Sequence, residues 1–347
     1  MVSRFFKAWL ATTVLLLAGG CGTPVPAPAM DPAALVWPEP PEPPRIRYLQ
    51  SVAGAQDWGI ERSWLQRLGD ALMGTGAQQL VRPSAVAEAA GVLYVADPGT
   101  RSLWILDRPN KRASQLKKVG NEALVSPVAL ALRADGAVFV ADTGLNKVFL
   151  LDREGALLRT FATQGLERPA GLAWSEAARR LYVLDSKRHR ITVFDGNGAL
   201  LRHMGGSGRG DGQFNYPTHL ALDASGALLV TDALNFRIQA LSQDGAFLWK
   251  FGHQGNGSGD FAAPKGIAAD AGGHYYVVDA LFDLVQIFDR SGQLLLVFGE
   301  RGERPGQLML PRGIFISNED KVYVADAYNH RVQVFQGAIA TAKESTQ

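Results

Sequence analysis

Residues 311–335 read PRGIFISNEDKVYVADAYNHRVQVF, and the chain repeats this pattern six times. Each repeat begins at a proline, continues through a short apolar segment and a polar turn, and enters a strand that ends in Asp. The repeat prolines are Pro83, Pro127, Pro169, Pro217, Pro264 and Pro311, and the aspartates are Asp97, Asp142, Asp185, Asp232, Asp279 and Asp326. The prolines are separated by 44, 42, 48, 47 and 47 residues. A nearly constant period of this length is typical of a repeat architecture.

Alternating apolar and polar residues within each repeat indicate β-strands joined by tight turns. In the last repeat the run VYVAD (322–326) is followed by RVQVF (331–335), and earlier repeats add a further run such as QLLLVFG (293–299). No repeat sustains the apolar spacing of an α-helix over three turns. Four strands in about 40–45 residues are typical of one propeller blade. The sequence therefore predicts an all-β, six-bladed β-propeller with four-stranded blades that start near residues 83, 127, 169, 217, 264 and 311.

Three longer motifs recur on top of this period. The motif P-x-G-I-A-x-D occupies 264–270, Y-V-A-D-x-x-N-H-R-V-Q-V-F occupies 323–335, and the connector F-G-x-x-G-x-x-x-G-x-(F/L)-x-x-P occupies 251–264 and 298–311. On these motifs, residues 83–335 resemble the NHL-repeat family of β-propellers. The resemblance implies the fold. It leaves the function open, because that family includes binding scaffolds and some relatives of enzymes.

The sixth repeat ends after its third strand and leads into a polar tail, 338–347. An open sheet edge would result unless another segment supplied the missing strand. Residues 45–53, RIRYLQSVA, alternate suitably and are expected to complete blade 6, so that the propeller spans 45–337. Between this closing strand and blade 1, one short helix is predicted over about 61–73 because its apolar residues share one helical face. That helix either packs on the propeller or docks a partner.

The N-terminal residues are typical of a secretory signal. Arg4 and Lys7 precede an apolar run, 8–17, and small residues stand directly before Cys21, the only cysteine. This arrangement resembles a bacterial lipobox, so a signal peptide over 1–20 and a lipid on Cys21 are expected. An ordinary signal peptide or an uncleaved anchor is the alternative. Gly22 after the cysteine favours the outer membrane, by resemblance to sorting in enteric bacteria.

Residues 22–44 hold nine of the eighteen prolines, which predicts an unpacked, semi-rigid tether over 21–44. Such a tether suits a domain that is held away from a membrane surface. Once Arg4 and Lys7 leave with the signal, 33 basic residues balance 33 acidic ones. A chain without net positive charge lacks the electrostatic footprint of a nucleic-acid-binding protein.

One face of the propeller is expected to carry the loops before each inner strand and those between the second and third strands. On that face Lys265 and Arg312 directly follow repeat prolines in adjacent blades, and His219 stands where other blades have Ala or Gly. Cationic groups interleaved with aromatic ones suit an anionic or aromatic-rich partner. The alternative is that these are solvated loop residues. The candidate binding residues are Lys265, Arg312, His219, Arg188, Phe236, Phe282 and Tyr328.

No recognisable catalytic or metal constellation accompanies this face, and no cofactor is expected. Metal-dependent lactonase-like propellers carry Asn or Asp after the blade proline, where this chain has Ser, Val, Ala, Thr, Lys or Arg. The six repeated aspartates are expected to be structural hydrogen-bond acceptors. The predicted function is therefore a lipid-anchored, extracytoplasmic scaffold of the bacterial envelope that binds an envelope protein or an anionic ligand. The alternative is a propeller enzyme, a lyase or lactonase-like hydrolase, with a non-standard channel site.

Overall fold

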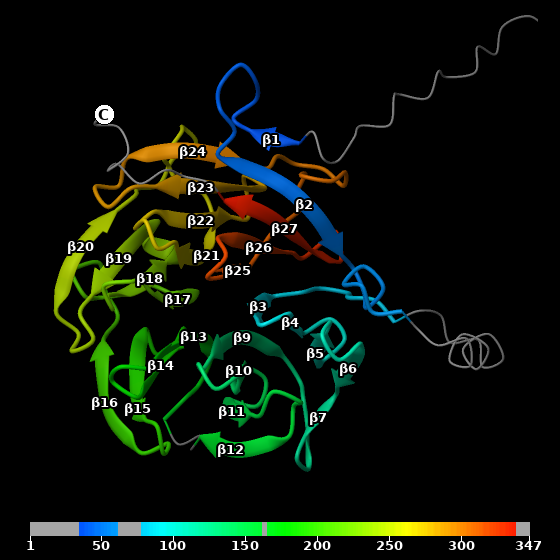
Figure 1. The fold of residues 1–347 in the computed structure, drawn as a ribbon. Coiled ribbons are helices and arrows are strands. Elements are labelled where there is room, and N and C mark those ends of the chain that lie inside the picture. The colour runs from blue at the N-terminus through cyan, green and yellow to red at the C-terminus, as the bar shows by residue number, and fades with distance from the viewer. Residues whose placement is uncertain (1–34, 62–77, 162–164, 338–347) are drawn as a thin grey trace, which may run out of the picture. The chain divides into compact units, whose positions relative to one another are not determined.

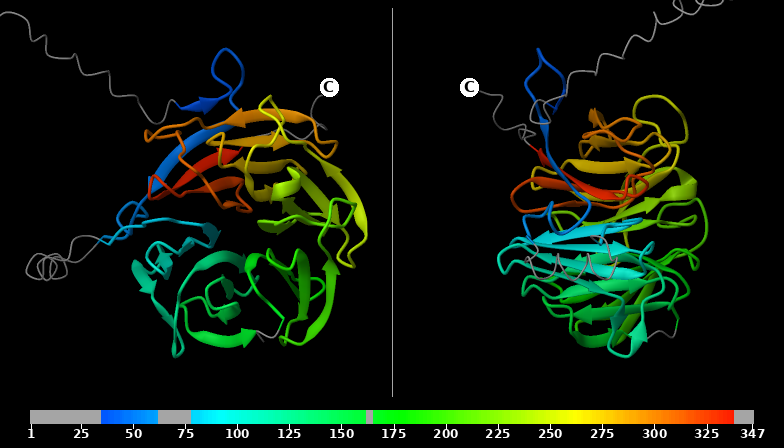
Figure 2. Two further views of the ribbon diagram at one scale, coloured as in Figure 1. Left: turned by 180° about the vertical axis from the view of Figure 1, so that it is seen from behind. Right: turned by 90° about the vertical axis from the view of Figure 1, so that its right-hand side faces the viewer.

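The computed structural model describes residues 35–61, 78–161, 165–337. Within these ranges, antiparallel sheets follow one another around a central axis and form the six blades of a propeller (Figure 1). Seen from behind and from the side, the strands of successive blades turn around the same axis (Figure 2). The prediction of an all-β, six-bladed propeller is confirmed.

Blades 1 to 5 each contain four strands, and the first strand in the chain lies next to the axis. Blade 1 consists of β3 (Ala85–Ala89), β4 (Val92–Asp97), β5 (Ser102–Asp107) and β6 (Arg112–Leu116). Blade 2 consists of β9 (Pro127–Leu132), β10 (Val138–Asp142), β11 (Lys147–Leu151) and β12 (Leu157–Phe161). Blade 3 consists of β13 (Pro169–Ser175), β14 (Arg180–Asp185), β15 (Arg190–Asp195) and β16 (Leu200–Gly205). A two-stranded hairpin, β7 (Lys118–Val119) and β8 (Glu122–Ala123), connects blades 1 and 2.

The second half of the ring repeats this plan. Blade 4 consists of β17 (His219–Leu222), β18 (Leu228–Asp232), β19 (Arg237–Leu241) and β20 (Phe247–Phe251), with the short 3-10 helix η2 (Ala233–Asn235) after β18. Blade 5 consists of β21 (Pro264–Ala269), β22 (Tyr275–Asp279), β23 (Leu284–Phe288) and β24 (Leu294–Phe298). Blade 6 begins with β25 (Ile314–Ile316), β26 (Lys321–Asp326) and β27 (Arg331–Gly337).

Blade 6 is closed by the beginning of the described chain. Strand β2 (Ile46–Val52) pairs antiparallel with β27, from Ile46 opposite Gly337 to Val52 opposite Val332 (Figure 1). The segment expected as a closing strand, 45–53, thus lies on the outer side of β27 as the fourth strand of blade 6. Because Ile46, Tyr48 and Val52 are buried there, the strand both covers the edge of β27 and completes the core beneath it.

The prediction that all of 21–44 is an unpacked tether is wrong for its last part. Strand β1 (Val36–Trp37) pairs with β2 and adds a fifth strand to blade 6. The Trp37 ring lies 6.0 Å from that of Phe298 and 5.8 Å from that of Phe335. Leu35, Val36 and Trp37 are not prolines, so they retain backbone N–H groups and apolar side chains despite the prolines around them. Trp37 and its neighbours therefore fasten the chain to the propeller.

Several expected segments fall on residues outside those that the structure describes. These are the signal peptide 1–20, the first part of the tether, most of the helix expected at about 61–73, and the tail 338–347. Within 35–61, 78–161 and 165–337, no helix has the length and apolar character needed to cross a membrane.

The repeated aspartates are buried acceptors, as the sequence indicated. All six side chains have 0% of their surface exposed. Asp142 accepts hydrogen bonds from the backbone N–H groups of Val125 (2.8 Å) and Ser126 (3.0 Å), which directly precede the proline of the same blade. Each such aspartate therefore fixes the point at which the chain enters its inner strand.

Candidate functional site

Four cationic side chains gather where the inner strands begin, and we call them the cationic mouth. Arg82 and Arg168 precede the prolines of blades 1 and 3, whereas Lys265 and Arg312 follow those of blades 5 and 6. Burial, followed by repulsion from Arg312, lowers the pKa of Lys265; the buried carboxylate of Asp279 partly offsets this, and repulsion from Arg168 adds to it. Burial, followed by repulsion from Arg82 and Arg168, lowers the pKa of Arg312. Arg312 is an exposed residue, although burial of its guanidinium is the main cause of its lowered pKa. The four charges are thus close enough to act on one another across the axis.

The backbone of the mouth is held by the buried aspartates. Asp97 accepts the backbone N–H of Arg82 at 3.0 Å, and Asp185 accepts that of Arg168 at 3.1 Å. In blade 6 the N–H of Arg312 donates to the carbonyl of Ala325 at 2.9 Å. The repeat therefore positions Arg82, Arg168 and Arg312 through hydrogen bonds of their main chain. These hydrogen bonds do not involve the cationic side chains.

None of the four cationic groups forms a salt bridge with another residue that the structure describes. Nearby cations behave differently, since Lys187 and Arg188 share Glu167 at 2.9 Å and 2.8 Å. Arg331 is likewise paired with the buried Asp326 at 2.9 Å. Like charges that lie close together without a counter-charge repel one another. An anion placed over the mouth would relieve that repulsion.

The structure brings only some of the sequence-predicted residues together. Lys265 and Arg312 belong to the mouth, and Tyr328, which is 48% exposed, lies close enough to Arg312 to affect its pKa. Arg188 is paired with Glu167, which it shares with Lys187. Phe236 packs against the core between blades 4 and 5. Neither Arg188 nor Phe236 therefore offers a free group to a partner.

Phe282 was predicted from the sequence as a binding residue, whereas Arg82 and Arg168 were not. Phe282 is half-buried, and its backbone N–H donates to Asp279. Arg82 and Arg168 were not predicted, because the candidate residues either follow the repeat proline or lie between the second and third strands, whereas these two precede the proline. The signal that identifies them is the dipeptide Arg-Pro at 82–83 and again at 168–169.

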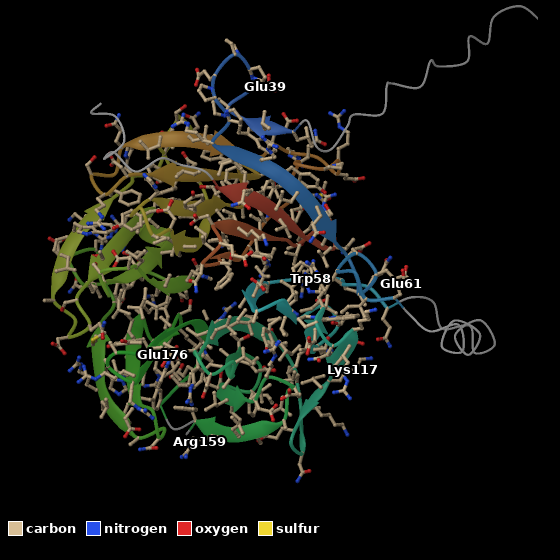
Figure 3. The ribbon with its side chains drawn as sticks, in the orientation of Figure 1. Glu39, Trp58, Glu61, Lys117, Arg159 and Glu176 are labelled. Atoms are coloured by element: carbon tan, nitrogen blue, oxygen red, sulfur yellow. The ribbon has the colours of Figure 1, made fainter. Side chains whose placement is uncertain are left out.

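A cavity of about 850 Å³ follows the axis, and we call it the channel cavity. Its open end is lined by turns that leave the inner strands, including Asp135, Asn318 and Glu176, which is labelled in Figure 3. Its inner end is lined by Ala85 and His219, which are second after their prolines. Since no residue of the cationic mouth lines it, the cavity opens on the face opposite the mouth.

The channel cavity ends where neighbouring inner strands touch. The N–H of Gly266 donates to the carbonyl of Arg312 at 2.9 Å, and the Thr218 hydroxyl donates to the carbonyl of Lys265 at 3.4 Å. A Cβ atom on Gly313 would lie only 2.6 Å from the carbonyl oxygen of Ser84. These contacts between successive blades narrow the axis just below the mouth, and they explain the small residues at this level.

His219 is the exception among those small residues. It is half-buried at the inner end of the channel cavity, and burial lowers its pKa from 6.5 to about 4. Its imidazole is therefore neutral near pH 7 and able both to donate and to accept a hydrogen bond. Among the residues described, no cluster of three or more His, Cys, Asp or Glu side chains is arranged to hold a metal ion.

One of these repeats matches a known protein-family model. The model of the NHL repeat matches residues 308–335, which run from the connector through β27. This match covers the last of six blades that share one plan. The chain is a six-bladed propeller that contains an NHL repeat in its last blade. A search of curated proteins found no match to it.

Solved structures share the fold of this NHL-repeat propeller at low sequence identity. A streptogramin B lyase superposes with a TM-score of 0.58 at 14% identity, over 74% of this chain and 94% of that one. A catalytically inactive histidine-to-alanine variant of virginiamycin B lyase from Staphylococcus aureus, with quinupristin, gives 0.57 at 14% identity over 74% and 94%. A protein of unknown function from Bacteroides thetaiotaomicron gives 0.65 at 14% identity over 84% and 76%. At this identity the likeness shows the propeller fold alone.

Proposed function

We propose that this NHL-repeat propeller is a binding scaffold of the bacterial envelope that captures a carboxylate-bearing partner at the cationic mouth. The observation that carries the proposal is the set of four cations, Arg82, Arg168, Lys265 and Arg312, without a salt-bridge partner among the described residues. An anionic protein segment or a sugar acid supplies the chemistry that such a mouth would bind.

The physical argument rests on the free energy of the unoccupied mouth. Burial, and after it repulsion between the cations, lowers the pKa values of Lys265 and Arg312, so carrying both charges reduces the stability of the fold. A bound carboxylate offsets this repulsion and accepts paired hydrogen bonds from a guanidinium. The exposed ring of Tyr328 adds apolar contact area beside the charges.

The proposed anchor is a lipid on Cys21. Its support is the small residues before the lone cysteine and the proline-rich residues after it. Because β1 fastens the chain at Val36, the tether between the lipid and the propeller is confined to residues 22–34. Thirteen extended residues reach at most about 45 Å, which would hold the propeller close to the outer or inner membrane surface.

The mouth can be tested with a fluorescent hexaglutamate peptide and with trigalacturonate. The double variant Lys265→Ala/Arg312→Ala should bind both probes about 30-fold more weakly, which corresponds to about 2 kcal/mol. The control Lys187→Ala/Arg188→Ala removes the same charge from the same face, but these cations are already paired with Glu167. Equal losses in the two double variants would show that net charge, and not the mouth, governs binding.

The anchor needs a separate measurement. In a bacterial host, Cys21→Ala should shift the protein from the membrane fraction to the soluble fraction or leave an unprocessed precursor, and a lipid-specific label should disappear. A Gly22→Ala variant keeps the cysteine and serves as the control. Normal processing and unchanged membrane partition of Cys21→Ala would contradict the lipid anchor and leave the mouth untouched.

A further inference from the structure

The channel cavity has the size and the lining of a small-molecule site. Its volume of about 850 Å³ lies within the range of roughly 300–1,000 Å³ that is typical of ligand pockets. Its walls carry apolar side chains from several inner strands, among them Leu130, Leu132, Leu222, Ala269 and Ile316. Apolar walls favour an apolar occupant, because its transfer from water buries apolar surface on both sides.

The charged groups at the open end are engaged within the fold. Arg133 pairs with Asp135 at 2.7 Å. The Glu88 carboxylate accepts the N–H of Gly91 at 2.7 Å and the hydroxyl of Tyr323 at 3.3 Å. Glu176 and Glu319 are also engaged, by the N–H of Ala134 and by the Lys321 ammonium. Arg153 also lines the cavity and has no salt-bridge partner among the described residues. The lining therefore carries four acidic and two basic side chains, and this entrance does not favour an anionic ligand.

Blade 4 departs from the repeat at two positions that face each other. His219 replaces the Ala or Gly of other blades, and its directly paired cross-strand neighbour is Thr231. Corresponding residues in the other blades are Ala96, Ala141, Leu184, Val278 and Ala325. Directly paired residues present their side chains on the same face of a sheet. Of these two polar side chains, His219 lines the inner end of the cavity, whereas Thr231 lies on the second strand and is fully buried.

Both of these polar side chains lack a hydrogen-bond partner among the residues that the structure describes. Thr231 is fully buried, and no described group bonds to its hydroxyl. The His219 ring lines the cavity and forms no hydrogen bond to a described residue, although five equivalent positions dispense with any polar group. Unpartnered polar groups in an apolar setting reduce stability. Thr231 is not among the residues that line the cavity, so a bound molecule would reach His219 alone. The presence of His219 is therefore explained better by a bound molecule than by folding.

We propose that the channel cavity binds an elongated, uncharged apolar molecule whose single hydroxyl or carbonyl group hydrogen-bonds to His219. The molecule enters from the face opposite the cationic mouth, with its apolar part along Leu130 and Leu132. Neutral imidazole pairs well with a hydroxyl or a carbonyl, whereas a carboxylate would be brought into an apolar site without a counter-charge. This site does not depend on the function proposed for the mouth.

The test uses the full chain with Cys21→Ser, so that no acyl chain competes for the cavity and no detergent is needed. N-phenyl-1-naphthylamine, an uncharged apolar dye, is the fluorescent probe, and 1-decanol and decanoate are the competitors at pH 7. The dye should bind with enhanced fluorescence, and 1-decanol should displace it at a concentration at least ~10-fold lower than decanoate, because an unpaired buried carboxylate is disfavoured.

Three variants decide between the cavity and other surfaces. His219→Ala, which installs the residue of blades 1 and 2, should weaken 1-decanol about 5- to 10-fold, the effect of one lost hydrogen bond. Ala221→Phe fills the channel and should abolish dye binding while circular dichroism stays unchanged. Lys265→Ala/Arg312→Ala should leave both competitors unaffected. Equal 1-decanol affinity with and without His219, or a loss caused by the mouth variant, would overturn the proposal.

Discussion

Acid should destabilise the propeller through His219. Burial lowers the pKa of this imidazole in the folded protein from 6.5 to about 4, whereas in the unfolded chain it keeps its ordinary pKa. Between these two values the unfolded chain binds a proton that the folded protein does not bind. The free energy of unfolding therefore falls as the pH drops through this window, and the loss is complete below pH 4.

The size of this loss follows from the width of the window. Each pH unit contributes up to about 1.4 kcal/mol, so acidification from pH 7 to pH 4.5 should cost the wild type about 2–3 kcal/mol through His219 alone. Other histidines contribute as well, since burial also lowers the pKa of His203. Their contributions are shared by the wild type and by His219→Ala, so the difference between the two proteins isolates the effect of His219.

Urea unfolding followed by tryptophan fluorescence at pH 7 and at pH 4.5 measures this difference. His219→Ala should lose about 2–3 kcal/mol less than the wild type on acidification. His330→Ala, which removes an exposed histidine from the turn between β26 and β27, serves as the matched control. If the wild type and His219→Ala lost the same stability between the two pH values, the lowered pKa of His219 in the folded protein would be contradicted.

Two further predictions concern the framework. Deleting 1–54 removes β2 and exposes the edge of β27, so this deletion should lower the melting temperature and cause aggregation. Deleting 1–34 removes no described strand and serves as the control. Equal melting curves and equal solubility of the two proteins would refute closure by β2. Asp142→Ala should cost about 3 kcal/mol or more in urea unfolding because it strands buried backbone N–H groups. Asp152→Ala, at an exposed turn, should cost less than about 1 kcal/mol, and equal costs would contradict the structural role of the buried aspartate.

The fold was predictable because its determinants are local and recur. Alternation of apolar and polar residues sets each strand, and turn residues such as Asn and Gly separate the strands. The blade-closing strand was recognisable for the same reason, since RIRYLQSVA alternates like any other strand. Strand β1 was missed because the surrounding prolines dominate the composition of its segment. The pairing of Val36 and Trp37 with β2 depends on the distant ring of Phe335, which no local pattern reveals.

The candidate site was only partly predictable. The positions of Lys265 and Arg312 after their prolines sufficed to place them near the axis. Arg82 and Arg168 reach the same mouth from the other side of the proline, because a buried aspartate folds the connector inward. Local patterns also identified His219 as unusual, but they could not show that it ends a cavity opening on the opposite face. That result depends on how closely six separate inner strands approach one another.

One property of the repeat connects the mouth with the channel cavity. Each inner strand begins at the mouth and ends at the opening of the cavity. Residues beside the repeat proline therefore determine the mouth, and residues from two positions after it onward determine the cavity. Contacts between inner strands, such as Gly266 with Arg312, separate the two levels. Substitutions at one level therefore leave the other unchanged. Because His219 lies just below that boundary, its variants should alter apolar binding without affecting capture of an anion, and the mouth variants should do the reverse.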